Sequence, residues 1–264
     1  MDKLFVIKIG GNVIDDDKNL SAFLLKFTAI EGKKILIHGG GKIATSIGEK
    51  LGIESKFING RRITDAETID LVTMVYGGLV NKKIVAQLQA LDCNAIGLTG
   101  ADANTIPATK RAITKEGIDF GFVGDVLSGQ LSTVNYQLFL DNELTPVLAP
   151  LTHDGEGNIL NTNADTIAAA VAVALSFVYD VRLIYCFEKK GVLENIDDEN
   201  SAIQLITKEI YEKLKNDNKL FDGILPKIDN AFVAIYSGVK EVLIGHADDL
   251  LVNVTDQTIG TLIK

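Results

Sequence analysis

The chain has 264 residues, and its 26 Lys and Arg stand against 35 Asp and Glu, which gives a formal net charge of −9. With 47% hydrophobic residues it can bury a large core, as one α/β domain or two lobes, so disorder, a collagen helix and a coiled coil are excluded. A net negative charge repels nucleic-acid phosphate and anionic lipid, so an anionic ligand needs a local cluster of donors. We therefore expect no nucleic-acid partner and no membrane partner.

The two cysteines give no sign of a disulfide-bonded or metal-binding protein. Cys93 and Cys186 lie in apolar runs typical of strands, without the spacing of a disulfide framework or a zinc site. The first residues lack a basic segment followed by a long apolar one, and no later stretch approaches the roughly 20 apolar residues of a membrane span. We expect two reduced core cysteines in a cytoplasmic protein.

Apolar runs of strand length alternate along the chain with helical patterns, which predicts βαβ units around a mainly parallel sheet. Strands are predicted at Leu4–Ile9, Lys34–His38, Ala95–Thr99, Thr145–Leu151, Val181–Phe187 and Glu241–Gly245. Helices are predicted at Lys42–Leu51, Ala66–Leu91, Asp165–Leu175, Thr207–Lys219 and Pro226–Ser237. The segment Ala108–Val134 mixes polar and Gly-rich pieces with short alternating runs, which predicts a hairpin flap.

Residues at the ends of these elements indicate where helices begin and end. Thr64-Asp-Ala-Glu67 has the form of a capping box before the longest helix, and Gly238 stands where a helix-terminating glycine would. Because no Ser/Gly-rich linker separates two halves, we expect one continuous sheet with a soft boundary at residue 162. Residues 1–162 would form an N-terminal lobe and residues 163–264 a C-terminal lobe.

The segment Phe5-Val-Ile-Lys8-Ile-Gly10-Gly11 joins a lysine in an apolar strand to two glycines. A buried charge needs a partner, and glycines let backbone N–H groups approach an anion closely. Two interpretations carry about equal weight. One is a phosphate site at the end of the strand, and the other is an edge-strand lysine whose ammonium group reaches water.

A second segment, Ile35-Leu-Ile-His38-Gly39-Gly40-Gly41-Lys42, runs from an apolar strand through three glycines into a helix. Such a loop directs several backbone N–H groups and a helix N-terminus at one place, which suits a phosphate or a developing negative charge. The spacing fits neither a Walker A loop nor a Rossmann fingerprint. A tight turn between strand and helix is the structural alternative.

Two further segments carry candidate ligand-binding groups, each with an ordinary structural alternative. Paired Arg61 and Arg62 at the entry to a helix can clamp a carboxylate through bidentate hydrogen bonds, but exposed arginines are common there. The side chains of Asn161, Asn163 and Asp165 alternate along an extended segment and would line one side of it, whereas Asn163 or Asp165 could equally cap the next helix.

The last candidate is Lys227, which follows Asp222-Gly223-Ile-Leu-Pro226 at the start of a predicted helix. A cation is unfavourable at a helix N-terminus, so the position makes more sense if an anion sits between the lysine and the backbone amides. The three histidines do not form a metal-binding pattern, and no Gly-x-Ser-x-Gly or Cys/His arrangement indicates covalent catalysis.

Taken together, these segments resemble the acetylglutamate kinase family of the amino acid kinase fold. The motifs that carry the resemblance are Lys8-Ile-Gly10-Gly11, His38-Gly39-Gly40-Gly41, Gly60-Arg61-Arg62-Ile-Thr64, Gly121-Phe-Val-Gly-Asp-Val126, Asn161-Thr-Asn163-Ala-Asp165, Gly223-Ile-Leu-Pro226-Lys227 and Gly260-Thr261. They follow one another over essentially the whole chain. The resemblance implies a three-layer αβα sandwich whose first lobe binds an N-acylglutamate and whose second lobe binds ATP.

The resemblance also implies a role for each motif. Lys8 and Lys227 would hold the phosphates and stabilise the moving phosphoryl group, and Asp165 would orient both lysines. Gly11 and Gly40 would donate backbone N–H groups to the reacting atoms. Nucleotide contacts would come from Lys8, Gly10, Gly11, Glu188, Gly191, Gly223 and Lys227. Substrate contacts would come from Gly39, Gly40, Gly41, Arg62, Asn161 and Asn163, with Arg62 on the α-carboxylate.

The chemistry of the implied reaction fits these groups. A glutamate side-chain carboxylate has a reference pKa of about 4.3, so it is already an ionised nucleophile at neutral pH and needs no general base. Catalysis then consists of bringing two anions together and neutralising the transferring group with Lys, backbone amides and Mg²⁺. Because Asn161, Asn163 and Asp165 lack the Asp/Glu cluster of a metal cage, we expect no dedicated metal site, with Mg²⁺ arriving on the ATP phosphates.

Two positions depart from the family pattern. Phe187-Glu188-Lys189-Lys190 replaces a Ser/Thr-Asp-Val step, with Glu188 in place of the Asp, and changes size and charge close to the expected ribose and adenine site. Arg61 stands where the family commonly has an apolar residue. This suggests the hypothesis that Arg61 meets a second carboxylate, as in an N-succinyl group. A side chain pointing to solvent is the alternative.

We therefore expect an ATP-dependent kinase that phosphorylates the side-chain carboxylate of N-acetyl-L-glutamate, or of a related N-acylglutamate, in arginine biosynthesis. The alternatives are a non-catalytic ligand-binding regulator on the same fold, or another amino acid kinase. Lys8 lies seven residues after Met1, which leaves no room for the N-terminal helix of the hexameric, arginine-inhibited branch. The resemblance thus implies a homodimer, paired through the Ala66–Leu91 helix.

Overall fold

The computed structural model describes residues 1–195, 197–217 and 224–264, and these residues form two compact units. The first unit combines residues 1–36 with residues 168–264, and the second comprises residues 37–167. The chain returns from the second unit to the first between residues 167 and 168, a few residues after the predicted boundary at residue 162. The first 36 residues group with the C-terminal part of the chain, unlike in the predicted division, because β1 (Lys3–Ile9) pairs with β11 (Asp180–Phe187).

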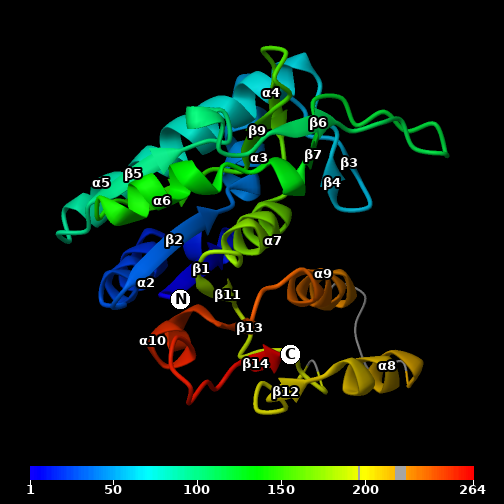
Figure 1. The fold of residues 1–264 in the computed structure, drawn as a ribbon. Helices are drawn as coiled ribbons and strands as arrows, with labels where there is room; N and C mark the ends of the chain where they lie inside the picture. The colour runs from blue at the N-terminus through cyan, green and yellow to red at the C-terminus, as the bar shows by residue number, and fades with distance from the viewer. Residues whose placement is uncertain (196, 218–223) are drawn as a thin grey trace. The chain divides into compact units, whose positions relative to one another are not determined.

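The main sheet has eight strands in the order β12-β14-β13-β11-β1-β2-β8-β5. Helices flank it, which confirms the predicted α/β fold class (Figure 1). In the first unit β1, β11 and β13 (Glu241–His246) run parallel, and the edge is formed by β14 (Thr261–Ile263) and β12 (Leu205–Ile206). Only β14 runs antiparallel to its neighbour β13 among the strand pairs described for this sheet.

Apart from the short strand Ala95–Leu98, the strands that were predicted from apolar runs are buried at nearly every position. The six residues after Lys3 in β1 are all buried, and β13 is buried except at its last residue. A parallel sheet covered by helices on both faces produces this pattern, because neither face of the strand meets water. The helices of the first unit are α1 (Gly11–Ile14), α2 (Asp17–Thr28), α8 (Lys208–Asn216), α9 (Leu225–Tyr236) and α10 (Leu250–Asn253), and α7 (Ala164–Leu175) spans the two units.

The second unit contains the parallel pair of β5 (Ala95–Leu98) and β8 (Thr145–Leu148). The end of β2 (Lys33–His38) leads into α3 (Gly41–Leu51). The predicted 66–91 helix runs as α4 (Ala66–Val72), the π-helical segment η1 (Thr73–Val80) and α5 (Asn81–Gln89). The predicted flap contains the antiparallel pair β6 (Ala108–Lys110) and β7 (Gly124–Val126), and α6 (Thr133–Asp141) follows it.

Three local predictions differ from the structure or gain detail from it. The cap of α4 is Asp65, whose side chain accepts from the Thr68 N–H, so the predicted capping box at Thr64 is wrong by one residue. The predicted strand Thr145–Leu151 is divided into β8 and the start of β9 (Leu151–His153), which pairs with β10 (Ile159–Asn161). Gly238 has φ +111° and follows the end of α9, as predicted for a helix-terminating glycine.

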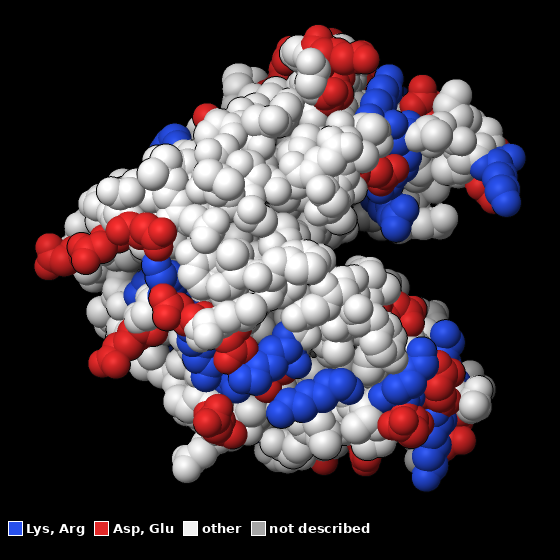
Figure 2. Space-filling view, viewed as in Figure 1, with Lys and Arg blue, Asp and Glu red and all other residues white. Residues whose placement is uncertain are grey.

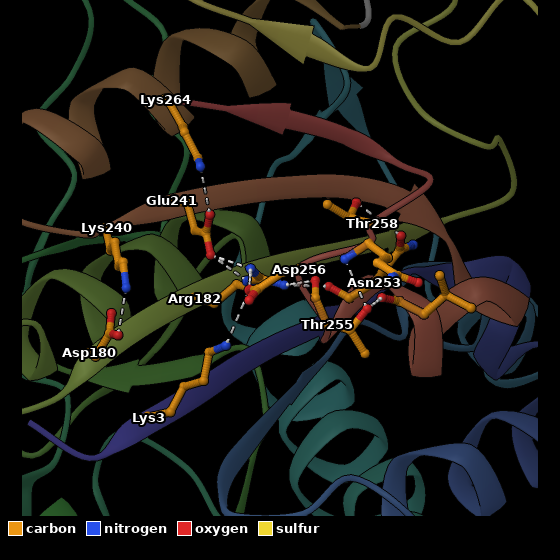
Figure 3. Close-up of polar contacts among 12 residues, drawn as sticks. Lys3, Asp180, Arg182, Lys240, Glu241, Asn253, Thr255, Asp256, Thr258 and Lys264 are labelled. Carbon is orange, nitrogen blue, oxygen red and sulfur yellow. Dashed lines mark hydrogen bonds and ion pairs between the residues drawn. The ribbon is translucent and has the colours of Figure 1, made fainter.

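A buried ion pair ties the C-terminal segment of the first unit to its sheet (Figure 3). Arg182 on β11 and Glu241 on β13 form a salt bridge, and their side chains are 3% and 7% exposed. The Arg182 guanidinium also donates to the backbone carbonyls of Asn253 (3.0 Å) and Thr255 (2.6 Å). Asp256 Oδ1 also lies 3.5 Å from its Nη2 atom. Because Arg182 uses its planar fork on four acceptors at once, the turn after α10 is fixed against the strands.

Three general properties of the described residues concern surface charge, helix hydropathy and the cysteines. On the face drawn in Figure 2, basic and acidic side chains stand beside one another. Within the described residues, none of the helices has the length and apolar character needed to cross a membrane. Both cysteines are buried and reduced, as predicted.

Candidate active site

Lys8 and the following glycines lie at the carboxyl end of β1. Lys8 is only 7% exposed. Its Nζ atom lies 3.7 Å from the place that a Cβ atom on Gly10 would occupy. Gly10 is the N-cap of the short helix α1, which begins at Gly11. Burial raises the pKa of the neighbouring Cys186 thiol to about 12, although the Lys8 charge acts in the opposite direction. The lysine therefore lies beside the backbone of a turn and near a thiol that stays protonated at neutral pH.

The ring of Phe187 joins the two lysines that were predicted to bind phosphate. The Nζ atoms of Lys8 and Lys227 lie 5.3 Å and 4.4 Å from the ring centroid, within cation–π range. Lys8 comes from β1, Phe187 ends β11, and Lys227 lies in the first turn of α9. Residues more than 200 positions apart in sequence thus contact one aromatic ring.

The other residues of the first unit that were predicted to bind the nucleotide differ in how far they are buried. Glu188 is exposed in the loop after β11. Gly191 packs against Thr261, because an added Cβ atom would lie 2.4 Å from the Thr261 hydroxyl oxygen. That hydroxyl oxygen accepts from the Val192 N–H at 2.8 Å. Gly223 lies outside the described residues, so the structure does not bear on its predicted role.

The three consecutive glycines form a tight connection between β2 and α3. Gly40 has φ +152° and ψ 9° at the N-cap of α3, a backbone conformation that favours glycine. A Cβ atom there would lie 3.0 Å from a ring carbon of Tyr76, so the loop also needs the space. The first N–H groups of an α-helix have no partner within the helix, so those of α3 are suited to an anion, and the anion site at this loop stays a prediction.

Arg62 is buried and holds the glycine loop from the side. It belongs to β4 (Arg61–Arg62), and its Nη2 atom donates to the Gly41 carbonyl at 3.0 Å and to the Thr45 hydroxyl at 2.9 Å. Nη1 donates to the Ser55 hydroxyl, and the guanidinium lies 4.7 Å from the centroid of the Phe57 ring. The structure thus brings Arg62 and Gly41 together, as required if both bind one substrate. It also gives Arg62 a structural duty that the sequence did not indicate.

Arg61 points away from this cluster. The strands β3 (Phe57–Ile58) and β4 form a two-residue hairpin in which Phe57 pairs with Arg62 and Ile58 with Arg61. Adjacent residues in a strand face opposite sides, so the buried Arg62 and the exposed Arg61 lie on different faces. This geometry favours the interpretation in which Arg61 reaches solvent.

The Asn161–Asp165 segment combines a bridging amide with a helix cap. Asn161 donates from Nδ2 to the buried Thr64 hydroxyl at 3.0 Å, and its backbone pairs with Val123 of the flap. Asn163 accepts from the backbone N–H groups of Asp165 (2.8 Å) and Thr166 (3.1 Å), so it caps α7, the alternative that the sequence left open. Asp165 follows in the first turn of α7 with its Oδ1 atom buried.

Sequence reasoning named His38 beside the glycine loop but missed its partner Asn81. His38 is fully buried, and its Nδ1 atom lies 2.7 Å from the Gly39 carbonyl oxygen. Its Nε2 atom lies 3.2 Å from Nδ2 of Asn81, the first residue of α5. Burial lowers the pKa of His38 to about 4, with a smaller lowering by the Lys82 charge. An Asn inside a long predicted helix was the signal available in the sequence, since Asn is a poor helix former.

The residues gathered near the glycine segments mostly carry hydrogen-bond donors. Among the residues that the structure describes, no three His, Cys, Asp or Glu side chains are grouped so that they could hold a metal ion. The donors gathered in each unit are instead ammonium, guanidinium and backbone N–H groups. Such donors bind oxyanions and suit a reaction between phosphate and carboxylate.

Comparison with known proteins agrees with the fold and with the donor chemistry. The amino acid kinase family matches residues 3–246, and the chain belongs to this family. An acetylglutamate kinase of Cytophaga hutchinsonii is 52% identical over 99% of this chain and 98% of its own length. An acetylglutamate kinase of Bacteroides thetaiotaomicron is also 52% identical, over 100% of this chain and 99% of its own. A solved structure of a Streptococcus mutans protein is 32% identical over 100% of this chain and 98% of its own, with a TM-score of 0.78.

Proposed function

We propose that this protein transfers the γ-phosphoryl group of ATP to the side-chain carboxylate of N-acetyl-L-glutamate, which produces an acyl phosphate for arginine biosynthesis. The observation that carries the proposal is the full-length similarity to acetylglutamate kinases at 52% identity. The oxyanion-binding donors of both units support it. The use of ATP follows from membership of a kinase family.

The proposed mechanism relies on positioning and charge neutralisation. Lys8 and Lys227, which share the Phe187 ring, would bind the ATP phosphates and follow the charge of the transferring group. The substrate carboxylate is ionised at neutral pH, so no side chain has to remove a proton. Mg²⁺ would enter as part of the Mg–ATP substrate and neutralise phosphate charge.

The substrate side of the proposal rests on the glycine loop and Arg62. Backbone N–H groups at the start of α3 would bind the reacting carboxylate or the transferring phosphoryl group. Arg62, held against the Gly41 carbonyl, would bind the α-carboxylate. The predicted contacts of Gly39, Asn161 and Asn163 and the lysine-orienting role of Asp165 remain part of this proposal.

A hydroxamate assay tests the function. Wild-type protein with ATP, Mg²⁺ and N-acetylglutamate should yield the hydroxamate, and free glutamate should yield little, because the acyl group completes the recognised substrate. Lys8→Ala and Lys227→Ala should each lower kcat at least 100-fold, about the effect of losing one preorganised charge-stabilising group. The exposed Lys50→Ala serves as the matched control. A folded wild-type protein that forms no hydroxamate would favour a ligand-binding regulator.

The proposal also covers the acyl group of the substrate and the oligomeric state of the protein. Because Arg61 is exposed on the face of β4 opposite Arg62, we expect a higher kcat/KM for N-acetylglutamate than for N-succinylglutamate. We also expect a homodimer in the cytoplasm. Apolar side chains on η1 and α6 support a partner surface: Met74, Leu79, Val134 and Leu138 are each more than half exposed. Sedimentation equilibrium distinguishes a dimer from a monomer. A higher kcat/KM for N-succinylglutamate than for N-acetylglutamate would assign Arg61 to the substrate site.

A further inference from the structure

We propose that His38, Asn81 and Lys82 are positioning residues that orient the peptide between Gly39 and Gly40, so that the Gly40 N–H is presented to the reacting oxyanion. The proposal rests on the proposed function, because it deepens the predicted role of Gly40 as a backbone donor. It depends on a chain of hydrogen bonds in which each member fixes the orientation of the next.

Lys82 fixes the side-chain amide of Asn81. The Lys82 ammonium donates to the Gly97 carbonyl at 2.8 Å and to Oδ1 of Asn81 at 3.2 Å. An ammonium group can only donate, so the Asn81 atom facing it must be the carbonyl oxygen. The Nδ2 atom of Asn81 also donates to the Val147 carbonyl at 2.9 Å, which requires the same orientation.

Asn81 in turn fixes the tautomer of His38. Its NH₂ group points at Nε2 of His38 at 3.2 Å, so Nε2 must be the accepting nitrogen. The imidazole is neutral at neutral pH, because burial lowers its pKa to about 4. A neutral imidazole carries one proton, which therefore sits on Nδ1.

The Nδ1–H group then fixes the peptide that follows Gly39. It donates to the Gly39 carbonyl oxygen at 2.7 Å. The chain has no cis peptide bond among the described residues, and in a trans peptide the carbonyl and the next N–H point in opposite directions. Holding the Gly39 carbonyl toward the buried imidazole therefore directs the Gly40 N–H away from it.

The surrounding structure leaves room for this arrangement and little room for others. A Cβ atom on Gly97 would lie 2.0 Å from Oδ1 of Asn81, so only glycine fits beneath the amide. The Tyr76 ring packs 3.0 Å from the Cβ position of Gly40. Tyr76 and Asn81 are joined by an i→i+5 backbone hydrogen bond of the π-helical segment, so one helix face contacts the loop twice. Such segments occur frequently at functional sites.

Two substitutions at His38 separate positioning from packing. The side-chain amide nitrogen of Asn lies close to the place of Nδ1, whereas that of Gln lies close to the place of Nε2. His38→Asn should keep a donor for the Gly39 carbonyl and stay within about 5-fold of the wild-type kcat. His38→Gln should lose that donor and lower kcat about 10- to 100-fold, somewhat less than the loss of a complete backbone donor. The KM values for ATP and N-acetylglutamate should change little in either.

A spectroscopic readout makes the test independent of turnover. In protein labelled with ¹⁵N-glycine, the amide signal of Gly40 should shift in His38→Gln and stay near its wild-type position in His38→Asn. If His38 variants do not fold, Lys82→Met tests the outer end of the chain, with the neighbouring exposed Lys83→Met as its control. Lys82→Met should lower kcat several-fold more than Lys83→Met.

The outcomes separate this inference from the proposed function. If the wild-type protein phosphorylates no N-acylglutamate, the function is wrong, while a Gly40 signal that shifts only in His38→Gln would still support the positioning role. Equal kcat values in folded His38→Gln and His38→Asn, with an unmoved Gly40 signal in both, would overturn the inference. So would equal kcat values for Lys82→Met and Lys83→Met, because Lys82 would then have no influence on the loop.

Discussion

Replacing Phe187 with leucine tests whether an aromatic face organises the two phosphate-binding lysines. Two like charges repel, and the ring relieves this repulsion by attracting both ammonium groups, which lie 5.3 Å and 4.4 Å from its centroid. Phe187 is half-buried, so each contact contributes about 0.5–1 kcal/mol. Phe187→Leu keeps the apolar bulk but loses both contacts, together about 1–2 kcal/mol. Since about 1.4 kcal/mol corresponds to a tenfold change, the KM for ATP should rise about 5- to 30-fold.

The assay is hydroxamate formation with ATP varied at saturating N-acetylglutamate. Phe187→Tyr is the matched control, because it keeps the aromatic face and should stay within about 2-fold of the wild-type KM. The KM for N-acetylglutamate should not change in either variant, because its proposed contacts come from residues 37–167. The reasoning fails if leucine and tyrosine variants have the same KM for ATP, or if only the KM for N-acetylglutamate changes.

Two predictions concern stability. Arg182→Met leaves the buried Glu241 carboxylate with only the exposed Lys264 ammonium at 3.4 Å as a cationic partner and should lower the free energy of unfolding by up to about 3–5 kcal/mol, a fall of up to roughly 6–20 °C in Tm by calorimetry. The double variant Arg182→Met/Glu241→Leu should recover much of this loss, and a double variant less stable than the single one would contradict the account. Burial lowers the pKa of His38 from 6.5 to about 4, so unfolding takes up a proton between these pH values. Wild-type stability should fall by about 3 kcal/mol as pH drops through this window, and urea unfolding of His38→Asn should lack this component; superimposable pH profiles would refute the shift.

The sheet could be predicted from the sequence because its strands carry a strong local signal. Runs that are apolar at all but one position, such as Leu4–Ile9, have few alternatives to a buried strand, and β1 has nearly these bounds. Helix α2 was not predicted, although Leu20, Phe23, Leu24 and Phe27 are buried with helical spacing and Asp16 caps its start. The β3–β4 hairpin was missed too, despite an Asn59-Gly60 turn with positive φ at both residues.

The parts of the candidate site that lie within one segment could be predicted from the sequence, and the contacts between distant segments could not. The glycine runs and Lys8 are visible in the sequence because each segment contains its own turn and donors. The shared ring of Phe187 and the contact of Asn81 with His38 join residues far apart in the chain, and no periodicity reports such pairings. The capping role of Asn163 and the structural bonds of Arg62 illustrate the opposite limit, since one side chain can serve folding at a position where the resemblance implies substrate binding.

The π-helical segment η1 makes the length of the chain part of the site. In an α-helix each residue turns the chain by about 100°, so two residues five positions apart would stand about 140° apart around the helix axis. The i→i+5 hydrogen bond from the Asn81 N–H to the Tyr76 carbonyl widens this turn and lets both residues face the glycine loop, Tyr76 against Gly40 and Asn81 against His38. The number of residues in this turn is therefore as much a part of the loop's geometry as the side chains that contact it.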